Sequence, residues 1–271
     1  ITFFVDGKWS EDWGLRASAD TREGPVDQLF TNFVDKSPES LLRRIDPRAV
    51  IGFGGYPTLP PIIAARTLRI PTAIHEQNAV MGRANRLLSR FADKAFVSYM
   101  PARSLPASHA AKAVLTGTPV RDAVLSLRNV PYAAPDILGR LLILVFGGSQ
   151  GARFFSEIMP QALPRLPEAM RNRITLVQQC REEDLYEVRA AYKKAGIAAH
   201  LAPFFRDLPE RIAQSHLVIA RAGASTVAEL AVAGRPSILV PLPIATDDHQ
   251  TDNARALADL ERWLVGIASI A

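Results

Sequence analysis

The sequence predicts an α/β protein made of two doubly wound domains with parallel sheets. From residue 49 onward, short apolar runs rich in β-branched residues alternate with helical patterns, which is typical of parallel sheets flanked by helices. A strand, a glycine-rich turn and a helix occur twice in the second half. At 271 residues, with 48% hydrophobic and 22% charged residues, the chain is long enough to bury two medium cores.

The alternation assigns each element in order. Strands are expected at residues 49–53, 72–75, 95–99, 141–146, 174–178, 200–203, 217–220 and 237–240. Helices are expected at residues 60–68, 83–92, 152–163, 182–195, 207–214 and 225–233, the last ended by Gly234. Residues 1–36 show no clean strand or helix periodicity. We therefore expect an N-terminal domain at 1–121, a proline-containing linker at 122–137 and a C-terminal domain at 138–271.

The net charge of +5 and the pI near 9.6 favour an acidic partner. No RNA-binding motif, zinc-finger spacing or basic tract is present, so phosphorylated small molecules and anionic lipid headgroups are expected and nucleic acid is not. The single Cys180 cannot form an internal disulfide, which indicates a reducing compartment. No apolar run approaches the roughly 20 residues that span a bilayer.

Two turns in the second half predict a bed for a nucleotide diphosphate. Residues 147–152 follow an apolar strand with a glycine-rich turn, and Ser149 could contact a phosphate. This turn has neither the G-x-G-x-x-G spacing nor a P-loop lysine, which argues against a dinucleotide or ATP hydrolysis. In the second turn, Ser225 and Thr226 begin a helix, and Glu229 follows one turn later. Glu229 could accept hydrogen bonds from a ribose diol, or be an acidic residue favoured by the helix dipole.

Polar residues also follow other strands. Residues 247–250 suit sugar hydroxyls; a metal is not expected, because adjacent aspartates diverge and no second ligand cluster appears. His75 beside Glu76 is a candidate acid–base pair, the alternative being a structural histidine. The helix from Arg83 carries Arg86 and Arg90 beside Leu87, Leu88 and Phe91, so it could lie on anionic lipid or simply cover the sheet.

Six motifs in order resemble the MurG family. They comprise residues 52–57, His75-Glu76-Gln77-Asn78 with Asn85, residues 117–121, residues 147–152, residues 221–226 with Glu229, and Asp248-His249-Gln250. The resemblance implies a GT-B glycosyltransferase whose two Rossmann-like domains face a cleft. Such an enzyme moves N-acetylglucosamine from UDP-N-acetylglucosamine to the undecaprenyl-pyrophosphoryl-muramyl-pentapeptide lipid of peptidoglycan synthesis, and thereby serves cell shape and division. It also implies no cofactor and a peripheral place on the cytoplasmic face of the bacterial plasma membrane.

The resemblance carries residue roles as well. On the donor side it implies Arg121 and the backbone near Phe205 for uracil, Glu229 for ribose, Ser149 with Ala224, Ser225 and Thr226 for the phosphates, and Asn78 with Gln250 for the sugar, with Arg221 and His249 in the same motifs. On the acceptor side it implies Tyr56, His75, Glu76 and Asn85. The expected reaction is an inverting displacement without an obligatory metal, with His75 or Glu76 as the base.

Both ends of the chain depart from this pattern. Residues 1–36 hold nothing like the family's Gly-Gly-Thr-Gly-Gly-His loop, and residues 261–271 also differ, so both domains are expected to be incomplete. Two alternatives therefore stay open: a UDP-sugar-binding, catalytically silent membrane-surface protein, and a related UDP-sugar epimerase.

Overall fold

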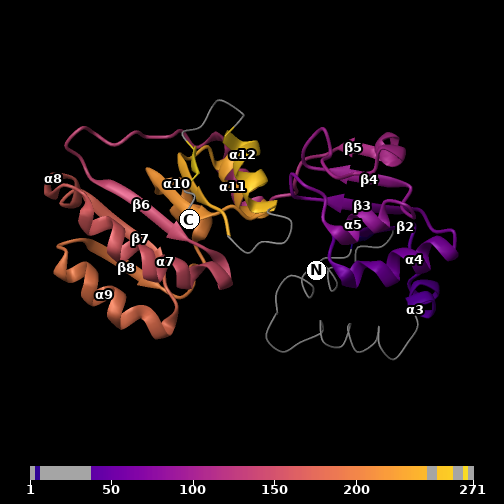
Figure 1. Cartoon of the computed structure of the whole chain (residues 1–271), viewed down its shortest axis with the longest axis horizontal. Helices are drawn as coiled ribbons and strands as arrows, with labels where there is room; N and C mark the ends of the chain where they lie inside the picture. Colours follow the sequence, from indigo (N-terminus) through magenta and orange to yellow (C-terminus); the bar gives the residue numbers. More distant parts are fainter. Residues whose placement is uncertain (1–3, 7–37, 243–248, 259–264, 268–271) are drawn as a thin grey trace. The chain divides into compact units, whose positions relative to one another are not determined.

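The structure is a computed structural model that describes residues 4–6, 38–242, 249–258 and 265–267. Of residues 4–6, 149–152 and 265–267, only the backbone is described. The chain divides into two compact units, Ile1–Thr118 and Pro119–Ala271, and each is built on its own sheet (Figure 1).

The first unit has a five-stranded sheet in the order β1-β2-β3-β4-β5. Its strands are β1 (Phe4–Asp6), β2 (Ala49–Gly52), β3 (Thr72–Glu76), β4 (Lys94–Val97) and β5 (Ala113–Leu115). All neighbours are parallel except β1, which pairs antiparallel with β2. The helices are α3 (Pro38–Ile45), η1 (Tyr56–Thr58), α4 (Leu59–Thr67), α5 (Arg83–Leu88) and η2 (Ala107–Lys112). Ile62 of α4, Ile74 of β3 and Leu88 of α5 meet in the core.

The second unit has a parallel six-stranded sheet in the order β11-β10-β9-β6-β7-β8. Its strands are β6 (Leu141–Phe146), β7 (Ile174–Gln179), β8 (Ala198–Ala202), β9 (Leu217–Arg221), β10 (Ser237–Val240) and β11 (Val265–Ile267). Its helices are α6 (Asp122–Leu125), η3 (Ser126–Asn129), α7 (Gly148–Ala162), η4 (Leu163–Arg165), α8 (Glu168–Arg171), η5 (Glu182–Asp184), α9 (Leu185–Lys194), α10 (Leu208–Gln214), α11 (Ala224–Ala233) and α12 (His249–Ala258).

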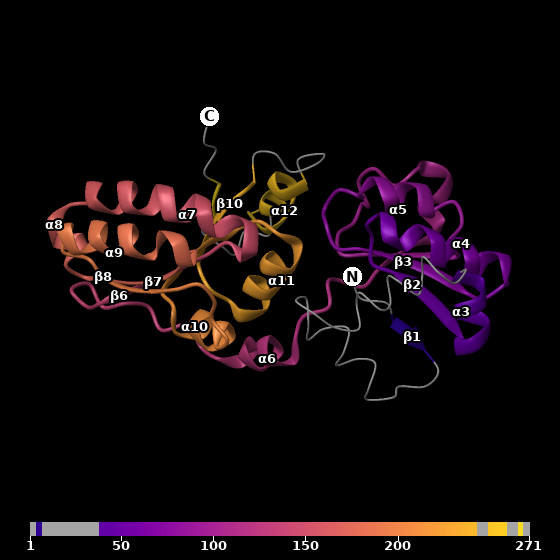
Figure 2. The ribbon, with the colours of Figure 1, turned by 90° about the horizontal axis from the view of Figure 1, so that it is seen from below.

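The central strand β6 shows why this sheet is covered on both faces. Ile143 and Val145 enter a core formed with α7 and α9, whereas Leu144 and Phe146 enter a second core formed with α10, α11 and α12. Successive side chains of a strand point to opposite faces, so a continuous apolar run requires helices on both. Figure 2 shows α7 and α9 on one face and α10 on the other. The predicted doubly wound α/β class is confirmed.

The predicted strands are all present, each within two residues at either end. The sequence patterns did not predict β1, β5 and β11, which are three residues long. The helix predicted at residues 83–92 is shorter in the structure. The α5 helix ends at Leu88, and the Lys112 ammonium donates hydrogen bonds to the carbonyls of Ser89 and Ala92 just beyond it.

The glycine-rich turn at residues 147–152 is shorter than predicted. Helix α7 already begins at Gly148, whose φ of 66° is left-handed. Glycine adopts that conformation without strain, so the chain reverses within one residue and residues from 148 onward form the first helical turn. In the segment expected as a linker, Val124 of α6 and Leu127 of η3 are buried, and both elements pack against α11 of the second unit.

Candidate functional site

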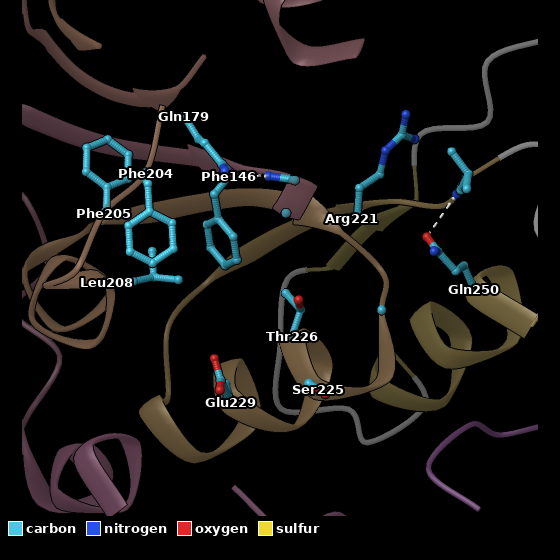
Figure 3. Close-up of a pocket in the computed structure, with 14 residues that line it drawn as sticks. Phe146, Gln179, Phe204, Phe205, Leu208, Arg221, Ser225, Thr226, Glu229 and Gln250 are labelled. Atoms are coloured by element: carbon cyan, nitrogen blue, oxygen red, sulfur yellow. Dashed lines mark hydrogen bonds between the residues drawn. The ribbon is translucent and has the colours of Figure 1, made fainter. Parts of the chain in front are cut away.

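A cavity of about 400 Å³ lies in the second unit, at the carboxyl ends of its parallel strands (Figure 3). Phe146 ends β6, Gln179 ends β7 and Arg221 ends β9, and all three line the cavity. The sheet order places β6 between β7 and β9: the chain runs from β6 through β7 and β8 on one side, and then crosses back to β9 and β10 on the other side. Ligands of open α/β sheets bind at such a switch point.

Two helices begin at this cavity. Gly147 and Gly148 line it at the start of α7, and Gly223, Ser225 and Thr226 line it at the start of α11. The first backbone N–H groups of a helix have no partner within the helix, and the helix dipole adds partial positive charge there. The arrangement suits an anion with more than one charged group. The side chain of Ser149 lies outside the described part of the structure.

Glu229 carries a carboxylate into the same cavity from the second turn of α11 (Figure 3). Its side chain is only 12% exposed, and Arg121 forms a two-pronged ion pair with it. Arg121 Nε donates to Oε1 at 2.9 Å, and one of its terminal nitrogens donates to Oε2 at 3.0 Å. The pair compensates the charge of a carboxylate that is largely withdrawn from water.

Arg221 is a second charged residue at the cavity, and it is buried. Its guanidinium lies 4.0 Å from the centre of the Phe154 ring and donates to the carbonyl of Pro241 at 2.8 Å. Burial lowers the pKa of this guanidinium. Its Nε is buried without a hydrogen-bond partner in the described part of the chain, so positive charge here is only partly compensated.

Aromatic residues form one wall. Phe204 and Phe205 both line the cavity. Phe205 is buried under the Arg211 guanidinium, whereas Phe204 is 71% exposed. Gln179 joins this wall to the start of α7, because its amide donates to Pro203 O while its carbonyl accepts from Gly147 N. An exposed aromatic ring beside polar groups suits a planar base.

Helix α12 contributes the opposite wall. Gln250 lines the cavity and accepts a hydrogen bond from Leu242 N at 3.0 Å (Figure 3). His249 is half-buried at the first position of α12 and is not among the residues that line the cavity. Asn253, on the same helix, is fully buried and donates to Ala222 O, which fixes α12 to the turn before α11. Asp247 and Asp248 lie outside the described residues.

The first unit brings a separate polar cluster together at the end of β3. Glu76 is only 4% exposed, and its carboxylate accepts four hydrogen bonds. Oε1 accepts from the backbone and side-chain nitrogens of Asn78, and Oε2 accepts from Gly82 N and the Asn85 amide. Glu76 thus holds the loop after β3 against the start of α5.

His75 is buried in the same cluster. Its Nε2 lies 2.9 Å from Gly117 O, which can only accept, so Nε2 carries the hydrogen and Nδ1 the lone pair. Nδ1 is buried without a partner among the described residues, and the ring stacks on Phe53 at 5.2 Å. Burial lowers the pKa of His75 despite the hydrogen bond to Gly117 and the nearby Glu76 charge.

The remaining predicted residues fall into these two groups. Tyr56 is exposed at the start of η1, in the turn after β2. Gly54 of that turn is in the left-handed region at φ 84° and lies against the Asn85 amide, where a Cβ would approach to 3.3 Å. Ala224 is the first residue of α11. The structure therefore gathers Tyr56, His75, Glu76, Asn78 and Asn85 in the first unit, and the other candidates in the second.

Three residues of the site were not predicted from the sequence: Phe204, Gln179 and Asn253. Gln179 and Phe204 directly follow predicted strands, and that position could have identified them as site residues.

Within the described residues, no cluster of three or more acidic, histidine or cysteine side chains could hold a metal ion. In the same part of the chain, no helix has the length and apolarity needed to cross a membrane.

Two family models match the chain. Residues 22–97 match the glycosyltransferase family 28 N-terminal domain, and residues 142–265 match the C-terminal domain of that family. The crystal structure of Acinetobacter baumannii MurG superposes with a TM-score of 0.69 at 34% identity, over 92% of this chain and 68% of that one.

Curated relatives of similar sequence carry the same family assignment. The UDP-N-acetylglucosamine–N-acetylmuramyl-(pentapeptide) pyrophosphoryl-undecaprenol N-acetylglucosamine transferase of Rhodospirillum centenum is 61% identical over 218 residues, and that of Paramagnetospirillum magneticum is 57% identical over 227. These alignments cover 80% and 83% of this chain, but only 58% and 61% of the relatives. A UDP-N-acetylglucosamine 2-epimerase structure from Neisseria meningitidis, at 15% identity and a TM-score of 0.55 over 83% of this chain and 66% of that one, shares only the fold.

Proposed function

The chain belongs to the MurG family, and from that premise we propose that it serves transfer of N-acetylglucosamine from UDP-N-acetylglucosamine to a lipid-linked muramyl-pentapeptide. The observation that carries the proposal is the cavity of the second unit, where two helix starts and the Glu229 carboxylate meet. A nucleoside diphosphate sugar presents two phosphates, a ribose and a base, and the cavity offers a group of suitable chemistry for each.

The diphosphate is assigned to the helix starts. Backbone N–H groups of α7 and α11, with Ser225 and Thr226, bind the phosphate oxygens, and Arg221 adds positive charge behind them. Charge grows on the diphosphate as the sugar leaves, so donors fixed in advance stabilise the transition state more than the ground state. Stabilisation of the leaving diphosphate therefore requires no rearrangement of charged groups in the protein.

The walls of the cavity are assigned to the ribose, the base and the sugar of the donor. Glu229 accepts a hydrogen bond from the ribose, the Phe204 ring and the backbone at Phe205 hold uracil, and Gln250 contacts the sugar. His249, at the start of α12, supports this wall without lining it. Asn78 remains a proposed sugar contact from the first unit, and Tyr56 and Asn85 remain proposed acceptor contacts.

The chemical step is an inverting displacement. A hydroxyl oxygen of the acceptor forms a bond to the anomeric carbon as the bond from that carbon to the diphosphate oxygen breaks, and the hydroxyl proton passes to a base. His75 and Glu76 are the two candidates for this base. His75 keeps an unused lone pair on Nδ1, whereas the Glu76 carboxylate already accepts four hydrogen bonds from the protein. We therefore assign proton acceptance to His75 and the shape of the loop to Glu76.

A lipid-linked acceptor requires access to a membrane surface. Leu87 and Phe91 are exposed in and just after α5, and the neighbouring Arg83 and Arg90 are exposed as well. Apolar side chains beside cations suit the interface of an anionic bilayer. We propose that this surface places the protein peripherally on the cytoplasmic face of the plasma membrane. Binding to vesicles of anionic lipid should fall with salt and in L87Q/R90Q; equal binding to zwitterionic vesicles would contradict the assignment.

Donor binding and sugar transfer test the proposed function separately. Calorimetry should detect UDP binding, and E229Q should weaken it by about 1.5–3 kcal/mol, the range for a hydrogen bond to a charged group. Transfer of labelled N-acetylglucosamine should require the lipid-linked acceptor. Nucleotide binding without transfer would instead support a silent binding protein, and conversion of the donor with no acceptor present would support an epimerase.

A further inference from the structure

The ion pair between Arg121 and Glu229 joins residues 108 positions apart at the edge of the cavity. Glu229 lines the cavity, whereas Arg121 is not among the described residues that do so (Figure 3). Arg121 therefore contacts a carboxylate of the cavity wall without itself lining the cavity.

The backbone that carries Arg121 is fixed to the helix that carries Glu229. Arg121 immediately precedes α6, and α6 packs on α11 with Val124 fully buried. Leu127 of η3 continues this contact into the core. The packing of α6 and η3 thus fixes the backbone position of Arg121, although its side chain is 58% exposed.

The geometry of the pair leaves Glu229 able to bind a ligand. Each carboxylate oxygen accepts one hydrogen bond from the guanidinium, and an ionised carboxylate has about four acceptor positions in all. A two-pronged arginine fixes the plane of the carboxylate as well as its charge. A ribose hydroxyl can then donate to a remaining lone pair on the cavity side.

We propose that Arg121 is a positioning residue for ribose recognition, which acts through the Glu229 carboxylate and does not itself contact the nucleotide. The proposal rests on the proposed function, because it assumes that the cavity binds a uridine diphosphate. It replaces the sequence-based expectation that Arg121 contacts uracil with a role behind the ribose.

The test is a double-mutant cycle with two ligands. UDP and 2′,3′-dideoxy-UDP are titrated by calorimetry into the wild-type chain, R121Q, E229Q and the double variant. For UDP, each single variant should bind about 10-fold more weakly, and the double variant no worse than E229Q alone, because both changes remove one interaction. For the dideoxy ligand, all four proteins should bind alike. R121K should recover only part of the loss, because lysine keeps the charge but not the fork.

A matched control comes from the exposed ion pair of Arg153 with Glu157, which has the same 2.9 Å separation. E157Q should bind both ligands as the wild type does, and thermal unfolding of every variant checks that the fold is kept.

Three results would overturn the role of Arg121. A loss in R121Q that persists with the dideoxy ligand and multiplies with E229Q would place Arg121 on the base. Tighter binding of UDP by R121Q would mean that arginine and ribose compete for the carboxylate. Wild-type affinity for UDP in R121Q would leave Arg121 no part in binding. A wild-type chain that binds neither ligand would refute the nucleotide site itself, and with it this proposal.

Discussion

Replacement of Glu76 by glutamine, E76Q, tests whether a single buried carboxylate holds the loop after β3. The glutamine oxygen can accept only one of the two pairs of hydrogen bonds, either those from Asn78 or those from Gly82 and Asn85. The new amide group then faces two donors that it cannot satisfy. Size and shape are nearly unchanged, so the loss reports hydrogen bonding and charge.

The magnitude follows from the lost bonds. Two hydrogen bonds to a charged group at about 1.5–3 kcal/mol each give an upper range of about 3–6 kcal/mol. Removing a charge from a buried position offsets part of this loss, so we expect the free energy of unfolding of the first unit to fall by about 3 kcal/mol. Asn78 also loses its orientation, so sugar transfer should decline together with stability.

Urea unfolding of the first unit measures the loss, and hydrogen exchange of peptides covering residues 77–83 locates it. Exchange should accelerate in that segment more than elsewhere in the sheet. The matched control is E39Q, in the first turn of α3, which should change stability by about 1 kcal/mol or less because only a helix-dipole interaction is altered. A loss in E76Q no larger than in E39Q, with unchanged exchange, would refute the reasoning.

Three further changes test other features. Burial depresses the pKa of His75 below 6.5, so the unfolded chain binds more protons at this residue than the folded chain, and the stability of the first unit should fall as pH drops below about 6.5. In urea titrations, H75Q should show a shallower dependence of unfolding free energy on pH, and an unchanged dependence would exclude His75 as its source. R235A removes a buried guanidinium that donates to Ala213 O at 2.9 and 3.0 Å. The loss of hydrogen bonds from a charged group should lower the unfolding free energy of the second unit by about 1.5–3 kcal/mol, and a loss no larger than that of a surface arginine would contradict this. G148A places a side chain at φ 66°, and no atom lies within 4 Å of the added Cβ, so the cost is backbone strain of about 1–2 kcal/mol. The strain should lower the melting temperature and weaken UDP binding. An unchanged melting temperature would show that α7 can begin with another backbone conformation.

The sequence was sufficient for the elements whose signal is local. The apolar run at residues 141–146 became β6 with the expected bounds, and Gly234 ends α11 in the left-handed conformation expected of a helix C-cap glycine. Residues that directly follow buried strands also marked the candidate sites, because the carboxyl ends of parallel strands share one edge of the sheet.

Elements with weak local signals needed their neighbours. The three-residue strands β5 and β11 are strands because each pairs with a longer strand beside it, and no periodicity can show in so short a run. The start of α7 at Gly148 depended on a single φ angle, which the residue type permits but does not require.

The sequence by itself therefore determined the doubly wound α/β class and which loops carry polar residues, since both follow from alternation along the chain. Only the tertiary structure decided which charges meet. Arg121 and Glu229 are 108 positions apart, so their ion pair exists only after packing brings α6 and α11 together. The donors to Glu76 lie within nine residues of it, but the sequence pattern did not show that its carboxylate turns toward them. Side-chain pairing depends on distances across the fold, and such distances are not encoded in any local pattern.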